Sequence, residues 1–140
     1  LAGGPVLAGL TVAFDAATDA GIPSIEAHCV GLADRFVAGL QSVEGVRITT
    51  PLDRSVRSGV VTFAIGAVNP HETAAALWGI DRIVVRVCND ARLRACFASY
   101  NDESDVDRTL AAIEQVALRG IPAGTPTAAE WTARMLDGED

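Results

Sequence analysis

Apolar residues recur at helical spacing in two blocks near the start of the chain. The first block predicts a helix from about Val6 to Ala20, and Gly21 followed by Pro23 marks its end and the start of another. The second block predicts a longer amphipathic helix that ends near Gly45. Its apolar stripe consists of Ile25, Cys29, Leu32, Phe36, Leu40 and Val43.

The spacing of apolar residues then changes from helical to alternating. Residues 46–49 predict a short strand, and residues 58–66, rich in β-branched side chains, predict a second. Two more strands are expected over 83–88 and 93–100. Because only the polar segment 89–92 separates these last two, an antiparallel hairpin is the simplest connection.

Polar residues that favour helix starts complete the pattern. Asn69-Pro70-His71-Glu72 offers an N-cap, a proline in the first turn and an acidic residue, and predicts a helix to about Trp78. The acidic cluster 101–105 predicts another helix with a buried stripe behind it, and Ala128 to Leu136 a last short one. We therefore expect an α+β fold, with a small, mainly antiparallel sheet of about four strands covered by helices.

Composition narrows the range of functions. The chain has 140 residues, which fits one domain, and 49% of them are apolar, enough to build a core. All 11 basic residues are arginines against 18 acidic residues. The absence of lysine excludes Schiff-base or phosphate-loop chemistry by a lysine of this chain. A net charge of −7 argues against nucleic acid and anionic membranes as partners, and the apolar start reads as neither a signal peptide nor a membrane span.

Few side chains suggest a metal site or a reactive group. Two histidines, His28 and His71, cannot form a multi-histidine site, and the acidic run 102–107 lacks the ligand spacing of a calcium loop, so we expect no metal. For His71, a place in a capped first helical turn is favoured over an acid–base role with its neighbour Glu72.

The cysteine pattern indicates reduced thiols. Cys29, Cys88 and Cys96 are an odd number without metal-ligand spacing, which favours a cytoplasmic protein over one with a disulfide framework. Cys88 ends a strand beside a tight turn and is a candidate reactive thiol. Cys96, inside a strand, is expected to be a small buried hydrophobe.

One arginine is not explained by packing. If Leu93, Ala95 and Phe97 face one side of their strand, Arg94 faces the other, with no carboxylate beside it in the sequence. A planar guanidinium is suited to bidentate capture of a carboxylate, so Arg94 is a candidate for substrate binding. The alternative is a salt bridge to a neighbouring helix or domain.

The segment around Arg94 also resembles a known signature. The run Leu93 to Asn101 (LRACFASYN), followed by Asp105-Val106-Asp107-Arg108, resembles the C-terminal signature of class V aminotransferases. These are pyridoxal-phosphate (PLP) enzymes of fold type I that include cysteine desulfurases, selenocysteine lyases, kynureninases and isopenicillin N epimerase-like proteins. Weaker similarity lies in Gly79-Ile80, Val85-Arg86 and Ala2-Gly3-Gly4-Pro5, so that the resemblance spans about residues 2–118.

This resemblance implies a division of labour between two domains. Residues 1–119 would be the small C-terminal domain, with 1–20 as a junction helix and 120–140 as a tail. Arg94 would bind the α-carboxylate of an amino-acid substrate, while a preceding large domain holds PLP and its lysine. The complete enzyme would be a homodimer, and this chain alone would be inactive.

Two departures from the family pattern limit the reaction types that we expect. Gly4 stands where the family usually has a threonine that reaches the cofactor phosphate, which leaves only a backbone N–H for that role. The loop before Arg94 is short, so Cys88 matches the nucleophilic cysteine of desulfurases only loosely. A lyase, epimerase or transaminase is therefore preferred over a cysteine desulfurase.

A second hypothesis is a stand-alone α+β domain that dimerises or binds a partner without catalysis. The missing lysine and Gly4 favour it, whereas the first residue, Leu rather than Met, favours a piece of a longer protein. Exposure of the first helical stripe in the folded chain, at Leu7, Leu10 and Phe14, would point to a missing neighbour.

Overall fold

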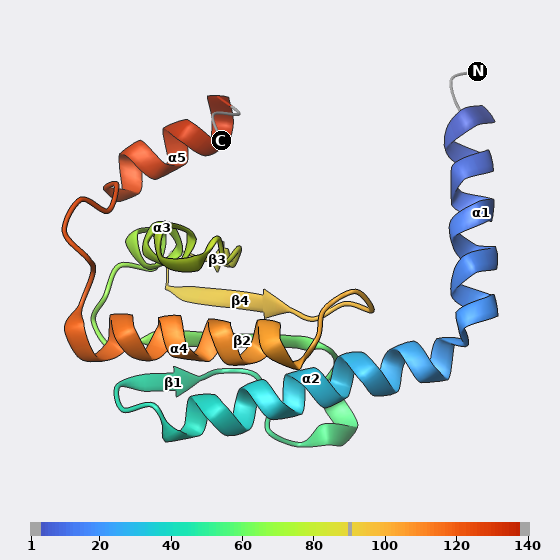
Figure 1. The fold of residues 1–140 in the computed structure, drawn as a ribbon, viewed down its shortest axis with the longest axis horizontal. Helices are drawn as coiled ribbons and strands as arrows, with labels where there is room; N and C mark the ends of the chain where they lie inside the picture. Colours follow the sequence, from blue (N-terminus) through green and yellow to red (C-terminus); the bar gives the residue numbers. More distant parts are fainter. Residues whose placement is uncertain (1–3, 90, 138–140) are drawn as a thin grey trace.

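The fold is described by a computed structural model that covers residues 4–89 and 91–137. It comprises five α-helices, a 3-10 turn and four strands in these residues (Figure 1). In chain order they are α1 (Gly4–Ala20), α2 (Ile22–Ser42), β1 (Val46–Ile48), η1 (Arg54–Val56), β2 (Val60–Ile65), α3 (Pro70–Asp81), β3 (Arg86–Cys88), β4 (Arg92–Cys96), α4 (Glu103–Arg119) and α5 (Ala128–Asp137).

The four strands form one antiparallel sheet in the order β1-β2-β4-β3. On one face of the sheet, Val61, Phe63, Leu93 and Ala95 are buried. They join buried residues of α2, α3 and α4 in a single core, so these helices cover that face. In Figure 1, α4 lies in front of β2. The expected α+β fold with a small antiparallel sheet is confirmed.

Three aromatic side chains pack against each other at the centre of this core. The ring of Phe36 on α2 lies 5.7 Å from that of Phe63 on β2 and 5.2 Å from that of Phe97, in edge-on arrangements that aromatic pairs prefer. Phe36 and Phe63 are fully buried. The contact fixes α2 against the sheet near the end of β4.

The predicted helix starts are present where the sequence placed them. Asn69 caps α3, with its Oδ1 accepting from the backbone N–H of His71 at 2.9 Å. Asp102 caps α4 in a reciprocal capping box with Asp105. Each cap accepts hydrogen bonds that the first helical turn would otherwise lack.

Element bounds differ from the expected ones at three places. Helix α3 continues beyond Trp78 to Asp81 and ends at Arg82, whose left-handed backbone (φ 53°) closes it. Residues 83–85, expected in a strand, precede β3 rather than belong to it. After Cys96 the chain leaves the sheet, and the side chain of Asn101 accepts from the N–H of Ala98.

The last predicted helix is present as α5. Its Trp131 lies 6.5 Å from Trp78 of α3, ring centre to ring centre, so α5 packs on α3. Among the described residues, no helix has both the length and the apolar character needed to cross a membrane.

Helix α1 stands apart from the rest of the fold (Figure 1). It runs away from the sheet and leaves its apolar stripe exposed: Leu7 is 62%, Leu10 49% and Phe14 61% accessible. These side chains match the stripe that the sequence pattern predicts, yet nothing in the described chain covers them. The hypothesis of a missing neighbouring domain predicts this exposure.

Candidate functional site

The face of the sheet opposite the helices carries basic side chains. Residues directly opposite each other in an antiparallel pair project to the same face. Arg94 lies opposite Thr62 of β2 and Arg86 of β3, whereas Arg92 lies opposite Cys88. The strand residues of this face include four arginines and no carboxylate: Arg47, Arg86, Arg92 and Arg94.

Arg94 has an unsatisfied donor. Its side chain is half-buried in the sheet surface, and its Nε is buried without a hydrogen-bond partner. No ion pair to Arg94 occurs among the residues that the structure describes, so the alternative of a salt bridge to a helix of this chain is not realised. A buried guanidinium N–H without an acceptor is costly, and a carboxylate would satisfy it.

The paired arginines of the described chain lie elsewhere, on helices or in the loop before β2. Arg35 of α2 binds Asp107 of α4 through two hydrogen bonds, at 2.9 and 2.8 Å. Arg54 and Arg57 both contact Asp34 of α2. The basic side chains on the open sheet face form no such ion pair within the described residues.

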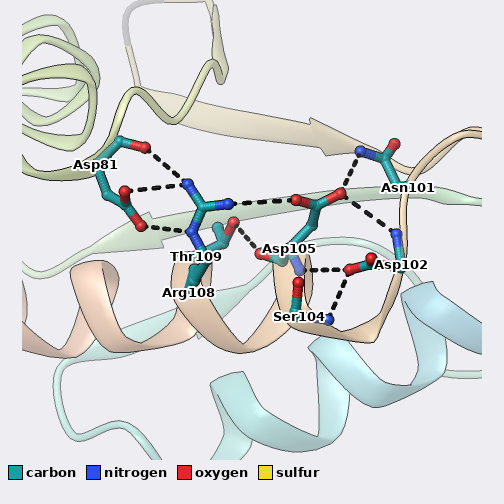
Figure 2. A network of polar contacts seen from close by, with 7 residues as sticks. All are labelled: Asp81, Asn101, Asp102, Ser104, Asp105, Arg108 and Thr109. Carbon is teal, nitrogen blue, oxygen red and sulfur yellow. Dashed lines mark hydrogen bonds and ion pairs between the residues drawn. The ribbon is translucent and has the colours of Figure 1, made fainter.

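The second half of the family-like signature has a structural role. Arg108 of α4 holds Asp81 at the end of α3 with Nε–Oδ2 2.7 Å and Nη2–Oδ1 3.0 Å. Its Nη1 also lies 3.6 Å from Asp105 (Figure 2). The hydrogen bonds from Arg108 hold the pKa of Asp81 below its ordinary value. Arg108 therefore ties α3 to α4 and is not free for a ligand.

The acidic residues of this signature also form contacts within the chain. Asp107 accepts from Arg35, which lowers the pKa of Asp107. Asp105 accepts from the Asn101 side chain at 3.0 Å, and Figure 2 shows this network at the start of α4. His28 donates through Nε2 to the carbonyl of Asn101 at 2.9 Å. The network fixes the segment that follows β4.

The two cysteines on the sheet differ from each other in exposure. Cys88 is half-buried at the end of β3, and β4 begins at Arg92, so the connection is short. Cys96 is exposed, and the expectation that it is a buried hydrophobe is wrong. The reason is alternation: Cys96 lies two residues from Arg94 and projects to the same open face, while Ala95 projects into the core.

Gly4 is the first residue of α1. Its backbone N–H has no partner within an α-helix, because the first N–H groups of a helix lack one. A Cβ placed on Gly4 would meet nothing within 4 Å, so the position is open. A phosphate oxygen is a suitable acceptor there. The structure places Gly4 and Arg94 on separate elements, α1 and β4.

A cleft lies between the segment before β3 and the end of β4. It has a volume of about 350 Å³, with Arg82, Cys96 and Arg108 among its lining residues. Arg108 is already paired with Asp81, and the Arg82 guanidinium lies over the ring of Trp78, 4.8 Å from its centroid. Within the described residues, no three His, Cys, Asp or Glu side chains gather as a metal site would require.

Comparison with known proteins decides the family. The model of the family described as "Aminotransferase class-V" matches residues 4–109, the part of the chain that contains both the open sheet face and α1. The chain belongs to the class-V aminotransferase family.

Its relatives in this family are named as desulfurases. A "Probable cysteine desulfurase" of Halalkalibacterium halodurans is 33% identical over 81% of this chain and 30% of its own length. "Probable cysteine desulfurase 2" of Mycobacterium leprae is 32% identical over 66% of this chain and 25% of its own length. The crystal structure of the cysteine desulfurase CsdA from Escherichia coli matches with a TM-score of 0.71 and 25% identity, over 81% of this chain and 30% of that one. The chain thus spans about a third or less of the length of these proteins.

Proposed function

We propose that this chain is the substrate-carboxylate-binding small domain of a PLP-dependent enzyme that acts on an amino acid, and that it is not catalytic by itself. The observation that supports it most is Arg94, a guanidinium on an open sheet face whose buried Nε has no acceptor. Family membership supports PLP as the cofactor, held by a large domain of the complete enzyme. We further propose that the complete enzyme is a homodimer.

In this proposal, the residues of this chain bind and orient the amino-acid substrate and the cofactor. When bound, PLP supplies an electron sink for the bond that breaks at the amino acid's Cα. Arg94 takes the α-carboxylate in a bidentate contact, which fixes the orientation of that Cα. The backbone N–H of Gly4 would be the group of this chain that donates to the phosphate of the cofactor bound in the second subunit. The covalent lysine comes from the large domain, since this chain has none.

The exposed stripe of α1 favours this proposal over a stand-alone domain. A monomer in water rarely leaves a row of large apolar side chains such as Leu7, Leu10 and Phe14 open along one helix. An adjoining domain that covers the stripe removes this difficulty. A stand-alone domain would have to cover it by self-association.

The reaction type that fits best is a lyase, epimerase or transaminase reaction, although the relatives are named as cysteine desulfurases. A sulfur-accepting cysteine must reach the substrate and then carry the sulfur away, which requires a mobile segment. Cys88 instead lies at the end of β3, directly opposite Arg92 in the hairpin. This position gives its thiol little freedom to move.

The proposal is tested in the complete enzyme, with this chain joined to a lysine-bearing PLP domain of the same family. We expect Arg94→Gln to raise the amino-acid concentration for half-saturation about tenfold to a hundredfold, because a charge-assisted contact contributes roughly 1.5–3 kcal/mol. The readout is the cofactor absorbance change on titration. Arg47→Gln, which removes the same charge from the same face, is the matched control.

Two results would overturn the proposal. One is an unchanged amino-acid affinity in Arg94→Gln. The other is a loss of affinity that is equal in Arg94→Gln and Arg47→Gln, because it would reflect the general charge of the face rather than a specific contact.

A further inference from the structure

The segment that leads into β3 has the side-chain pattern of a strand but is not paired with one. Ile83 and Val85 pack against the core, whereas Val84 between them is 75% exposed. Such alternation is typical of a strand. No backbone hydrogen bond joins residues 83–85 to another strand within the described part of the chain. We call residues 82–85 the strap.

The register of the β3–β4 hairpin shows where the strap would fit. Arg86 lies opposite Arg94, and the same register carried two residues further places Val84 opposite Cys96. In the structure a cleft of about 350 Å³ lies there instead, lined on one side by the strap and on the other by the end of β4. The sheet thus lacks part of the strand that the sequence predicts.

The backbone of Cys96 can pair with a further strand. The N–H of Phe97 donates to the carbonyl of Gly59, just before β2, at 2.8 Å. Backbone groups of successive strand residues point to opposite sides, so the N–H and C=O of Cys96 point away from β2 and towards the strap. Within the described residues, neither group bonds to the strap. An unpaired strand edge favours pairing with a segment that can reach it.

Contacts with α3 hold the strap in its present position. The N–H of Arg82 donates to the carbonyl of Trp78 at 2.9 Å, and the next N–H along the chain donates to that of Leu77 at 3.3 Å. The Arg82 guanidinium lies 4.8 Å from the centre of the Trp78 ring, a favourable contact between a cation and an aromatic face. Arg82 also has a left-handed backbone, which residues other than glycine rarely adopt. The start of the strap is therefore anchored to the end of α3.

Helix α5 takes part in this anchor. Trp131 of α5 packs on Trp78, with 6.5 Å between the ring centres, and so restricts the ring that Arg82 contacts. Helix α5 lies beyond residues 4–109, which match the family model. A helix outside the matched part of the chain is thus connected, through two side chains, to the segment beside the strand of Arg94.

We propose that the strap moves between two positions and that α5 controls which one is occupied. In the open position, which this structure shows, Trp131 keeps Trp78 and Arg82 in contact. In the closed position the strap leaves α3, and residues 83–85 extend β3 along the free edge of β4. Closure exchanges the cation–π contact and the last backbone bonds of α3 for bonds of the sheet, so the two positions compete. This switch goes beyond the proposed function and does not depend on it.

Disulfide trapping in this chain tests the proposal. Val84→Cys supplies a thiol that the closed position brings directly opposite Cys96, within the Cα separation of about 4.4–6.8 Å that a disulfide requires. Cys29→Ala and Cys88→Ala remove the other two thiols. With oxidised glutathione as the oxidant, the two thiols form one disulfide and release two molecules of reduced glutathione. Peptide mass spectrometry measures the rate.

We expect slow trapping in this background and an increase of about threefold to tenfold on adding Trp131→Ala, as loss of a cation–π contact would give. Arg82→Asn, which tolerates the left-handed backbone but lacks the guanidinium, should increase the rate as well. Trp131→Phe, which keeps an aromatic ring against α3, should leave it nearly unchanged. The matched control replaces Val84→Cys by Val60→Cys, because Val60 already lies opposite Cys96 on the β2 side. Its trapping should be fast and independent of Trp131.

Three results would overturn the proposal. The first is no trapping of the Val84→Cys chain in any variant under conditions that trap the Val60→Cys chain. The second is an equal rate with and without Trp131, which would remove α5 from the control of the strap. The third is an equal increase for both thiol pairs, because it would reflect a general loosening of the sheet. Circular dichroism checks that each variant is folded, and Arg82→Asn decides the outcome if Trp131→Ala is not.

Discussion

Gly39 of α2 lies against the Leu110 side chain of α4, and substituting it gives a sharp test of the packing. A Cβ built on Gly39 would lie 2.3 Å from Cδ1 and 2.8 Å from Cδ2 of Leu110 on α4. Atoms cannot approach this closely, so Gly39→Ala must displace the Leu110 side chain or separate the helices. The Cδ atoms are the far end of a flexible, half-buried side chain that can turn aside, so the overpacking cost lies at the low end of the usual range, about 1 kcal/mol.

A second effect of the substitution has the opposite sign. Alanine is favoured over glycine inside a helix by about 1 kcal/mol. Gly31 lies in the same helix and offers the matched control, because a Cβ there meets nothing within 4 Å. We expect Gly31→Ala to raise the free energy of unfolding by about 0.5–1 kcal/mol. The free energy of unfolding of Gly39→Ala should be lower than that of Gly31→Ala by about 1 kcal/mol, the overpacking cost alone.

Urea unfolding followed by circular dichroism measures these differences. In a Leu110→Ala background the clash is absent, so Gly39→Ala should change the free energy of unfolding as Gly31→Ala does. The coupling energy between Gly39→Ala and Leu110→Ala in a double-mutant cycle then equals the overpacking cost. If Gly39→Ala stabilises the chain as much as Gly31→Ala does, with Leu110 present, the close contact between α2 and α4 is refuted.

Two further predictions concern thiol reactivity and pH. The exposed Cys96 should react with iodoacetamide faster than the half-buried Cys88, and peptide mass spectrometry measures both rates. Faster modification of Cys88 would indicate an activated thiol and favour desulfurase chemistry. The hydrogen bonds from Arg108 lower the pKa of Asp81 in the folded chain. The stability linked to this carboxylate is therefore fully present above the unfolded pKa of about 3.9, and it is lost as the pH falls through the lower pKa of the folded state. Unfolding in urea at about pH 5 and about pH 3 should show a smaller loss of stability in Arg108→Ala than in the parent; an equal loss would contradict the linkage.

The local features of the fold could be predicted from the sequence because they depend on short-range rules. The caps at Asn69 and Asp102 are set by side chains within three residues of the turn that they cap. Alternation likewise placed Arg94 on the face opposite Leu93 and Ala95. The same rule puts Cys96 beside Arg94 on the open face, so the exposure of Cys96 follows from the alternation and the predicted burial does not.

The long-range features could not be predicted in this way. Arg35 meets Asp107, and Arg108 meets Asp81, only because of how α2, α3 and α4 cross. No spacing along the chain encodes those crossings. The pairing of Arg86 with Arg94 depends in turn on the length and register of the hairpin. The sequence predicts the hairpin only as the simplest connection between two longer strands, without its register.

The separation of α1 from the core has a consequence for how this helix acquires its structure. The core is closed by α2, α3, α4 and the sheet, and α1 contributes no residue to it. Most of the stability of a protein helix comes from packing of its apolar face rather than from intrinsic propensity, and α1 has 17 residues with that face open. If the proposed large domain covers Leu7, Leu10 and Phe14, its docking would therefore stabilise the helical order of α1, and the two processes would be coupled. Calorimetry of that docking should show a negative heat-capacity change, the sign of apolar burial.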